Sequence, residues 1–279
     1  MAFQTLTPDP CLADVIDCLW TSEDHRPPHA YEHIFPSGAV EIVINLTDGE
    51  LRCYDPEHAT VRRMRAPVLT GVFERAFVVD TAQQRSMAGV RFKPGAAWRL
   101  LGAPVSAFTN DHADLAVMLG PEAAHLADRM ANARSLTARL RMLHDALAGR
   151  LRRQSHPAVS WAVEQLCDHY ADVRIGALVD ESGLSGRRFN EVFAREVGLT
   201  PKAFLRVRRF RAALTHLGAL GCRRTGSEVA AACGYSDEAH LIRDFRGFSG
   251  LTPAAFRDGR IYQPPSAAPD PDHALRAAS

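Results

Sequence analysis

The sequence predicts an α+β protein: a small antiparallel β-barrel with helices, followed by an all-α domain built around a duplicated helical unit. Three observations support this prediction. Short β-branched runs separated by Pro and Gly occupy the first hundred residues, a helical period begins near residue 111, and one helical unit occurs twice in the last third. We expect two domains, at residues 1–153 and 154–261, and a disordered tail at 262–279, which is rich in Pro and Ala.

The duplicated unit is recognised by alignment of the chain with itself. At one constant offset Phe189 corresponds to Leu241, and Phe193 corresponds to Phe245. Both copies then end in the same string, Gly-Leu-Thr-Pro-x-Ala-Phe. Apolar residues that match apolar residues and lead into an identical turn indicate one supersecondary unit present twice.

Each copy is predicted as a short helix, a turn containing Gly, and a second helix capped by Ser, at Ser185 and at Ser236. One residue more separates Ser236 from Leu241 than separates Ser185 from Phe189. Two short helices joined by a tight turn are the helix-turn-helix of DNA-binding proteins. The last third is therefore predicted to contain two helix-turn-helix units.

The second helix of each unit has one apolar and one outward face when residues are placed at about 100° per residue. Arg can donate two hydrogen bonds to guanine and Asn can bond adenine, so these side chains suit the reading of base edges. The alternative is an ordinary solvated face, and the duplication favours DNA over it. The outward positions are Arg187, Asn190, Glu191 and Ala194 in the first copy and Ala239, Ile242, Arg243 and Arg246 in the second.

The residues from Val229 to Arg257, including Gly234-Tyr235-Ser236 and Gly250-Leu251-Thr252-Pro253, resemble the C-terminal signature of AraC/XylS-type transcriptional regulators. The resemblance covers Val159 to Arg260. It implies two helix-turn-helix units joined by a long helix, each with a recognition helix in the major groove of double-stranded DNA. Gly226 departs from the family pattern, which has an aliphatic residue there, and Gly weakens a helix interior by about 1 kcal/mol. The predicted DNA-binding residues are Ser185, Arg187, Arg188, Asn190, Glu191, Ser236, Glu238, Ala239, Ile242, Arg243 and Arg246.

A connecting helix is predicted from Pro201 to about Leu220, with an apolar stripe on one face. Some twenty residues at about 1.5 Å each span about 30 Å, close to the roughly 34 Å pitch of B-DNA. The helix can therefore place both recognition helices in successive major-groove turns. Arg206, Arg208 and Arg209 are predicted phosphate contacts, with solvated surface charge as the alternative.

The first hundred residues predict a small antiparallel barrel or sandwich. The run 39–46 is stopped by Thr-Asp-Gly and resumes at 51–54, as in a hairpin. Within the AraC/XylS-type group, Cys18-Leu19-Trp20, Phe35-Pro36-Ser37-Gly38 and Gly89-x-Arg91-Phe92-x-Pro94-Gly95 resemble a cupin-like N-terminal domain. Further strands are expected at 68–73, 76–80 and 87–92, and a helical segment at 96–101.

A leucine stripe follows in the helical part of the N-terminal domain. Leu136, Leu140, Leu143, Leu147 and Leu151 recur on one face of a helix that Ser135 is expected to cap. The stripe either packs on the β domain or pairs with its copy on a second chain. Because regulators of this type often dimerise through the N-terminal domain, we expect a homodimer and test the stripe as its interface.

Composition limits the class of protein. The formal net charge of +1 excludes a strongly basic coat, so DNA binding must come from local clusters of charge. The sequence has no apolar run as long as a membrane span and no signal-peptide pattern at its start, so a cytoplasmic location without membrane contact is expected. The six cysteines have no zinc-site spacing and are expected to be reduced.

The enzyme alternatives are a cupin-like metal enzyme and a DNA-repair protein fused to a DNA-binding domain. His25, His29, Glu32, His33 and Glu41 cluster in sequence but do not form a cupin metal motif, and no zinc-binding cysteine cluster is present. No catalytic residue, metal or cofactor is therefore predicted. The expected function is a transcription regulator in which a small-molecule effector or partner acts on the N-terminal domain, with RNA polymerase as a partner if it activates.

Overall fold

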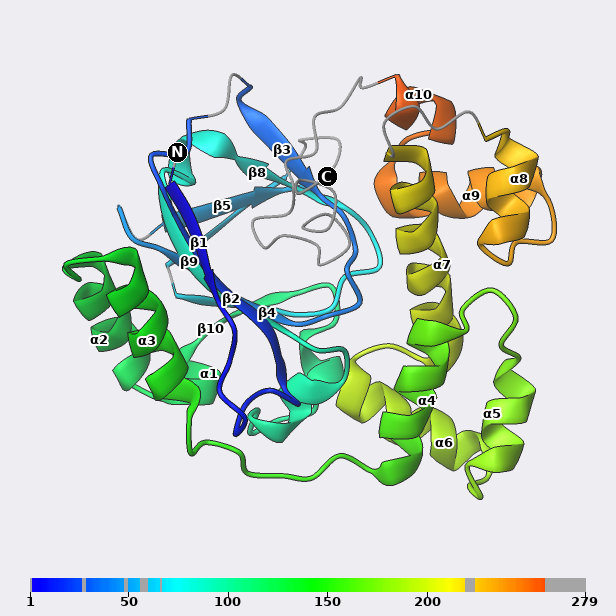
Figure 1. The fold of residues 1–279 in the computed structure, drawn as a ribbon, viewed down its shortest axis with the longest axis horizontal. Coiled ribbons are helices and arrows are strands. Elements are labelled where there is room, and N and C mark those ends of the chain that lie inside the picture. The colour runs from blue at the N-terminus through cyan, green and yellow to red at the C-terminus, as the bar shows by residue number, and fades with distance from the viewer. Residues whose placement is uncertain are drawn as a thin grey trace.

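The computed structural model describes residues 2–26, 29–47, 50–55, 60–65, 67–218 and 224–258. The predicted tail and the last residues of the connecting helix lie outside these ranges. The antiparallel β part comes first and the all-α part second, so the predicted fold class is confirmed (Figure 1). None of the described helices is long and apolar enough to cross a membrane.

The N-terminal part contains two antiparallel sheets in the described ranges. The first runs in the order β1-β2-β9-β4-β7-β10 and the second in the order β3-β8-β5-β6. Their strands are β1 Ala2–Leu6, β2 Ile16–Glu23, β3 Tyr31–Ile34, β4 Glu41–Asn45, β5 Glu50–Tyr54, β6 Val61–Arg65, β7 Val68–Thr70, β8 Phe77–Asp80, β9 Ser86–Phe92 and β10 His112–Asp114.

The predicted hairpin between the runs 39–46 and 51–54 is wrong. β4 pairs with β7 and β9 in the first sheet, whereas β5 pairs with β6 and β8 in the second. The Asn45 amide donates to the Glu50 carbonyl at 2.8 Å, so the chain passes from one sheet to the other at this point. A turn signal shows that the chain reverses or bends, but distant strands decide which sheet each segment joins.

Short helices complete the N-terminal part, and two of them cover the first sheet beside β1 and β2 (Figure 1). The expected helical segment at 96–101 is the short 3₁₀ turn η2. The bounds are η1 Thr81–Gln83, η2 Ala96–Arg99, η3 Val105–Phe108, α1 Ala116–Leu119, α2 Glu122–Ala131 and α3 Leu136–Leu147.

The leucine stripe is core at its centre and lies on α3 except for Leu151, which follows the end of the helix; Leu136 and Leu151 are half-buried. The Ser135 hydroxyl caps α3 by accepting a hydrogen bond from the Ala138 N–H, as predicted. Leu140, Leu143 and Leu147 are completely buried, and α3 packs on α2, β1, β2 and β9. The stripe as a dimer interface is therefore wrong, because its side chains are already covered by the same chain.

The helical part is arranged around α7, which crosses it from one helix-turn-helix unit to the other (Figure 1). Phe204 packs against Phe193 near the start of α7, and Phe210 packs against Phe245 and Phe248 further along. The bounds are α4 Pro157–Asp168, α5 Ile175–Glu181, α6 Gly186–Val197, α7 Pro201–Gly218, α8 Gly226–Ala232, α9 Glu238–Ser249 and α10 Pro253–Arg257.

The two parts share one continuous hydrophobic core. Phe35, just after β3, lies 6.0 Å between ring centroids from both Phe210 of α7 and Phe256 of α10. The boundary predicted between residues 153 and 154 falls between α3 and α4, where Arg153 lies over the Trp98 ring at 4.2 Å. We retain that boundary as a proposal.

Candidate nucleic-acid interface and ligand cavity

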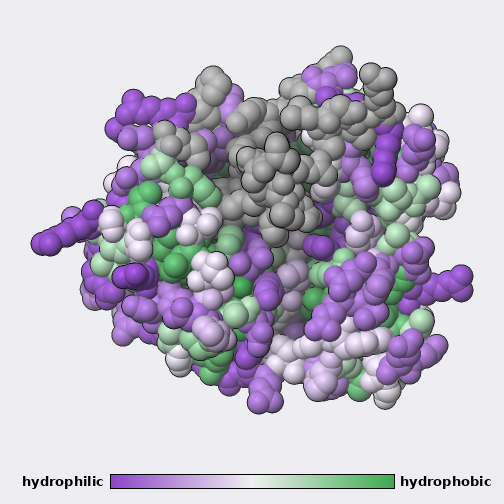
Figure 2. Space-filling view, viewed as in Figure 1, coloured by the Kyte–Doolittle hydropathy of each residue, from purple (hydrophilic) through white to green (hydrophobic). Residues whose placement is uncertain are grey.

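The first recognition helix, α6, is fixed by its caps and its buried face. The Ser185 hydroxyl accepts a hydrogen bond from the Arg188 N–H at 3.3 Å, and Gly198 ends the helix with a left-handed backbone, φ 93°. Phe189 and Phe193 are completely buried. These local signals place the outward residues of α6 on the surface, and Figure 2 shows mainly hydrophilic side chains over this part of the helical domain.

The outward side chains of α6 bind one another. Glu191 accepts a hydrogen bond from Arg187 Nε at 2.9 Å and lies 3.7 Å from Arg188 Nη1. Because of the hydrogen bond from Arg187, the pKa of Glu191 is lowered, and that of Arg187 is raised by the same contact. Asn190 donates to the Gly186 carbonyl at 2.8 Å. Of the four predicted outward residues, Arg187, Asn190 and Glu191 are exposed, whereas Ala194 is half-buried; the neighbouring Arg188 is exposed as well.

The second recognition helix, α9, is capped by Asp237 and not by the predicted Ser236. The Asp237 carboxylate accepts from the His240 N–H at 2.7 Å, while the exposed Ser236 hydroxyl donates to Asp237. The cap therefore stands four residues before Leu241, the same interval as from Ser185 to Phe189 in α6. The additional residue in the second copy lies before the cap.

The outward face of α9 is small or apolar near its start and basic beyond it. Ala239, Ile242, Arg243 and Arg246 are all exposed. Ile242 retains 37% of its surface, unusual for a large apolar side chain and suited to contact with a thymine methyl group. The two recognition helices therefore present different chemistry at equivalent positions.

Glu238 ties α9 to α8. Its carboxylate accepts from the Ser227 hydroxyl at 2.9 Å, and a Cβ at Gly226 would lie only 2.1 Å from Glu238 Oε1. Gly226 is the first residue of α8, where Thr225 and Glu228 form a capping box. The expectation that Gly226 weakens a helix interior is therefore wrong, because it stands at the helix start and makes room for Glu238.

Two of the three arginines predicted to contact phosphate bind groups within the protein. Arg206 donates to buried Asp244 of α9 through Nε at 3.1 Å and Nη2 at 2.8 Å. This hydrogen bonding raises the pKa of Arg206. Arg209 donates to the carbonyls of Tyr170 and Ala171, which follow α4. Both side chains therefore hold neighbouring elements against α7.

Arg208 is half-buried, on the side of α7 that approaches α4. Burial raises the pKa of the Cys167 thiol in α4, and the nearby Arg208 charge opposes that shift. The Nε atom of Arg208 is buried without a hydrogen-bond partner in the described part of the chain. Unlike Arg206 and Arg209, Arg208 therefore has no hydrogen bond from its buried Nε to a group of the described part of the chain.

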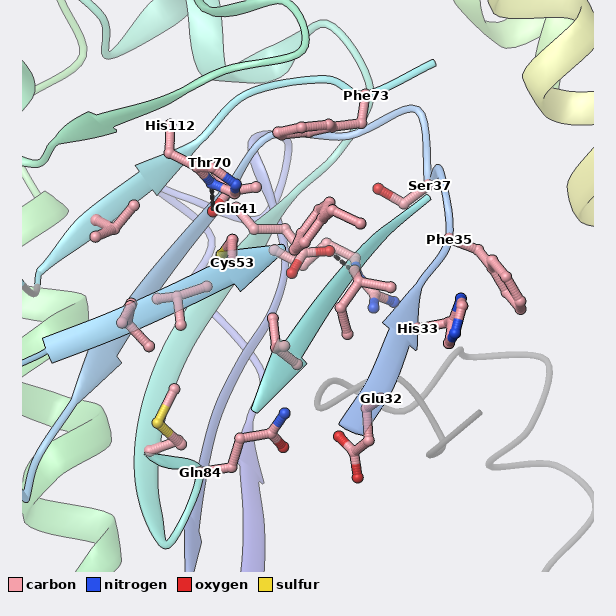
Figure 3. Close-up of a pocket in the computed structure, with 18 of the residues that line it drawn as sticks. Glu32, His33, Phe35, Ser37, Glu41, Cys53, Thr70, Phe73, Gln84 and His112 are labelled. Atoms are coloured by element: carbon pink, nitrogen blue, oxygen red, sulfur yellow. Dashed lines mark hydrogen bonds and ion pairs between the residues drawn. The ribbon is translucent and has the colours of Figure 1, made fainter. Parts of the chain in front are cut away.

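A cavity of about 440 Å³ lies between the two sheets of the N-terminal part and extends to Arg211 of α7. Its walls are mainly apolar and include Phe73 and Phe77. Glu41 of β4 and Arg91 of β9 form an ion pair on the wall, with 3.2 Å between Arg91 Nε and Glu41 Oε1 (Figure 3). Enclosure, apolar walls and a few polar groups are typical of small-molecule sites.

His112 of β10 is a neutral hydrogen-bonding group in the same wall. Its Nδ1 lies 3.1 Å from the Thr70 hydroxyl (Figure 3), and its ring packs against Phe73 and Phe77. Burial, with a smaller effect from the Arg62 charge, lowers the pKa of His112 to about 4. The imidazole is therefore uncharged near neutral pH.

The histidines considered as metal ligands form hydrogen bonds around one carboxylate. His25 Nε2 and His29 Nε2 lie 3.4 Å and 3.0 Å from the same oxygen of Glu32, which is completely buried. Glu41 is paired with Arg91 instead. Within the described ranges, no group of three His, Cys, Asp or Glu residues is arranged to hold a metal ion.

The segment between β7 and β8 lies between the cavity and both recognition helices. Its Phe73 lines the cavity. Its Val72 side chain would lie 3.2 Å from a Cβ placed on Gly198, the C-terminal cap of α6. Its Ala76 N–H donates to the Phe248 carbonyl in the last turn of α9 at 2.7 Å. One short segment therefore contacts the C-terminal ends of both α6 and α9.

Two family models match the chain. Residues 178–259 match a helix-turn-helix domain, and residues 4–114 match a domain of unknown function, DUF6597. The C-terminal domain is an AraC-type helix-turn-helix domain. The AraC-type domain matches the HTH-type transcriptional activator RhaS of Escherichia coli strain K12, with 33% identity over 97 residues, 33% of each protein. The chain thus spans about a third of the length of the curated relatives it matches.

Solved structures are also similar. The DNA-binding domain of AdpA, determined in complex with a target DNA, has 25% identity and a TM-score of 0.34, and the match covers 37% of this chain and 92% of that one. ToxT from Vibrio cholerae has 10% identity and a TM-score of 0.46 over 92% of this chain and 98% of that one.

Sequence reasoning missed several residues of the site. Asp244 is buried on the apolar face of α9. In the sequence, only the presence of a charged residue on that face indicated that it needs a partner. The additional residue before Leu241 could have revealed Asp237 as the cap. For His112 and Thr70 no local signal exists, because they meet only when β10 pairs with β7.

Proposed function

We propose that the protein is a sequence-specific DNA-binding transcription regulator controlled through its N-terminal domain. The observation that carries the proposal is the pair of exposed recognition faces, on α6 and α9, at the two ends of one connecting helix. The match of residues 178–259 to a helix-turn-helix domain and the similarity to the activator RhaS support it. The same two findings point to a regulator and not to an enzyme.

The length of α7 supports the use of both faces on one DNA duplex. Its 18 residues span about 27 Å at about 1.5 Å per residue. Successive major-groove turns on one side of B-DNA are roughly 34 Å apart. Recognition helices that extend beyond the ends of α7 can therefore enter adjacent turns of the groove.

The residue roles follow from the contacts of each side chain. In α6, Arg187, Arg188 and Asn190 would read bases, and Glu191 would orient the two arginines. In α9, Ala239, Ile242 and Arg243 would read bases. The DNA sugar-phosphate backbone would be contacted by Ser185, Ser236 and Arg246. Glu238 would position α9, and Arg208 would contact a phosphate from α7.

Control through the cavity is supported by the segment between β7 and β8. Its Phe73 lines the cavity, while Val72 and Ala76 contact the ends of α6 and α9. A ligand that moves Phe73 would therefore change how the two recognition helices are held. We propose a small molecule as the effector, with a homodimer as the assembly, the cytoplasm as the location and RNA polymerase as a partner if the protein activates.

In vitro selection from random DNA duplexes tests the DNA-binding function. We expect enriched sequences with two preferred boxes about ten base pairs apart, centre to centre. The full chain should be used, with unrelated duplexes at the same salt concentration as the control. Enrichment of no sequence, or of a single box that both helices read, would contradict the proposal.

Hydrogen exchange of the full chain tests the coupling segment. Phe73→Ala should speed amide exchange in the last turns of α6 and α9, because the segment loses its support from the cavity side. Phe3→Ala is the matched control, since Phe3 also lines the cavity but belongs to β1. Equal changes for the two variants, or none for Phe73→Ala, would remove the segment from the mechanism.

A further inference from the structure

We propose that the cavity binds an uncharged, mainly apolar molecule that carries one amide-like or hydroxyl group, and that the Arg91–Glu41 pair recognises this group. The inference rests on the proposed sensing role of the N-terminal domain and specifies the ligand class. It comes from two features of the cavity wall: its charges are already paired, and the central pair offers both a donor and an acceptor.

The guanidinium groups of the described lining are engaged, and the carboxylate oxygen Glu32 Oε2, which has no hydrogen-bond partner there, is completely buried. Arg91 pairs with Glu41, and the buried Glu32 accepts from two imidazoles. Arg211 is likewise engaged in an interaction. A ligand carboxylate or ammonium entering this apolar space would lose its hydration without meeting an exposed, unpaired opposite charge. The cavity therefore disfavours ions of either sign.

Arg91 of β9 and Glu41 of β4 lie directly opposite each other in the antiparallel pairing of these two strands. Arg91 keeps only 8% of its side-chain surface, whereas Glu41 keeps 23%. Glu41 can accept a hydrogen bond from a ligand N–H or O–H, and the guanidinium can donate to a ligand oxygen. A group that both donates and accepts, such as a primary amide or an alcohol, satisfies both partners without separating them.

Binding of three probes with the same carbon skeleton to the full chain tests the proposal. The probes are 4-phenylbutanamide, 4-phenylbutanoate and 4-phenylbutylammonium, each titrated at neutral pH by calorimetry without DNA. We expect the amide to bind at least tenfold more tightly than either ion. The proposal is overturned if an ion binds as tightly as the amide, or if none of the probes binds the folded chain up to its solubility limit.

Two variants test the role of the pair. Glu41→Gln removes the negative charge directly across from Arg91, so the preference for amide over carboxylate should fall at least tenfold or invert. Arg91→Met removes the positive charge beside Glu41, so the affinity for the ammonium probe should rise at least tenfold relative to the affinity for the amide. Glu50→Gln is the control, because Glu50 lies outside the lining and the preference should stay unchanged. An unchanged preference in both folded cavity variants would refute recognition by the pair.

These outcomes separate the ligand from the DNA-binding function. Binding is measured directly, so a failure of the probes leaves the two-box selection result intact. Conversely, if the chain binds the probes but selects no DNA sequence, the proposed ligand site is supported and the proposed DNA-binding function is contradicted. Thermal unfolding of each variant establishes that it is folded, and the probe series on the unchanged protein needs no variant.

Discussion

The two recognition helices are copies of one unit that differ in what they expose. Their caps, Ser185 and Asp237, each lie four residues before the first buried apolar residue, and both helices end at a glycine with a left-handed backbone, Gly198 or Gly250. Their outward faces differ: α6 carries a cluster of paired charges, whereas α9 begins with small and apolar side chains. The comparison teaches that the framework of the unit is independent of the chemistry it presents.

The buried faces differ in polarity at three matched positions: Val192 and Asp244, Glu196 and Phe248, and Val197 and Ser249. Val192 of α6 corresponds to Asp244 of α9, and both are buried. Val192 needs only apolar neighbours, whereas Asp244 is held by Arg206 from the connecting helix. The second unit is therefore fixed to α7 by an ion pair that the first unit does not have at that position.

The largest expected effect comes from breaking this pair. Arg206→Ala leaves the buried Asp244 carboxylate without its arginine, with only His240 Nε2 still near it at 3.9 Å, and should lower the free energy of unfolding by about 2 to 3 kcal/mol. Asp244→Val copies the first unit and should cost less than about 1 kcal/mol, because Arg206 is half-exposed and can be hydrated. Urea unfolding measures both. Equal losses would show that the pair matters through packing alone.

Base preference tests whether the two helices read different sequences. Arg187→Ala and Arg243→Ala should each cost about 1 to 3 kcal/mol of binding and relax preference in only one of the two boxes. The measurement is binding to operators randomised one box at a time. If both variants relax the same base pairs, or neither changes preference, the two-groove arrangement is wrong.

The connecting helix offers a contrast between two neighbouring arginines. Arg208→Ala should weaken binding to all sequences alike and reduce the salt dependence by one phosphate contact, a change of about 1 in slope. Arg209→Ala removes hydrogen bonds to Tyr170 and Ala171 and should lower stability while leaving the slope unchanged. Fluorescence anisotropy over a salt series distinguishes them. A change of slope for Arg209→Ala alone would reverse these roles.

Two glycines at helix starts sharpen the comparison further. Gly186→Ala in α6 meets only an ordinary contact with Val179 and should stabilise by about 0.5 kcal/mol. Gly226→Ala in α8 displaces Glu238 from Ser227 and should lose this gain, giving a difference of about 1 kcal/mol between the variants. Thermal unfolding compares them, and equal stabilities would mean that Glu238 does not hold α8 to α9.

The smallest expected effect is a difference between the two helix caps in how their stabilisation depends on pH. The hydrogen bond from the His240 N–H lowers the pKa of Asp237, so its contribution is present above the unfolded pKa and is lost as pH falls through the folded pKa. Ser185 does not titrate. Acid should therefore loosen α9 before α6, and Asp237→Ser should remove this difference. Amide exchange in the first turn of each helix between pH 6 and 3, in about one-unit steps, provides the measurement.

The sequence by itself determined the order of domains, the duplication and the outward faces of α6 and α9. These features depend on residues close together in the chain: a cap such as Ser185, a Gly at the helix end, and the helical period of Phe189 and Phe193. Near neighbours are positioned by backbone geometry alone, so their arrangement is readable before folding is known. Within the recognition helices, the local prediction of the cap failed where a second polar residue, Asp237, competed with Ser236.

Tertiary structure alone decided the features that join distant segments. The stripe of Leu140, Leu143 and Leu147 has the same period whether it packs on β1 and β2 or on another chain, and only the fold shows that it is core. The strand partners of β4 and β5, and the cavity with Arg91 and Glu41 on its wall, likewise depend on long-range pairing. An apolar period indicates that a face must be buried, and a turn signal indicates that the chain bends. Neither identifies the partner segment, because the residues that cover the face come from elsewhere in the chain.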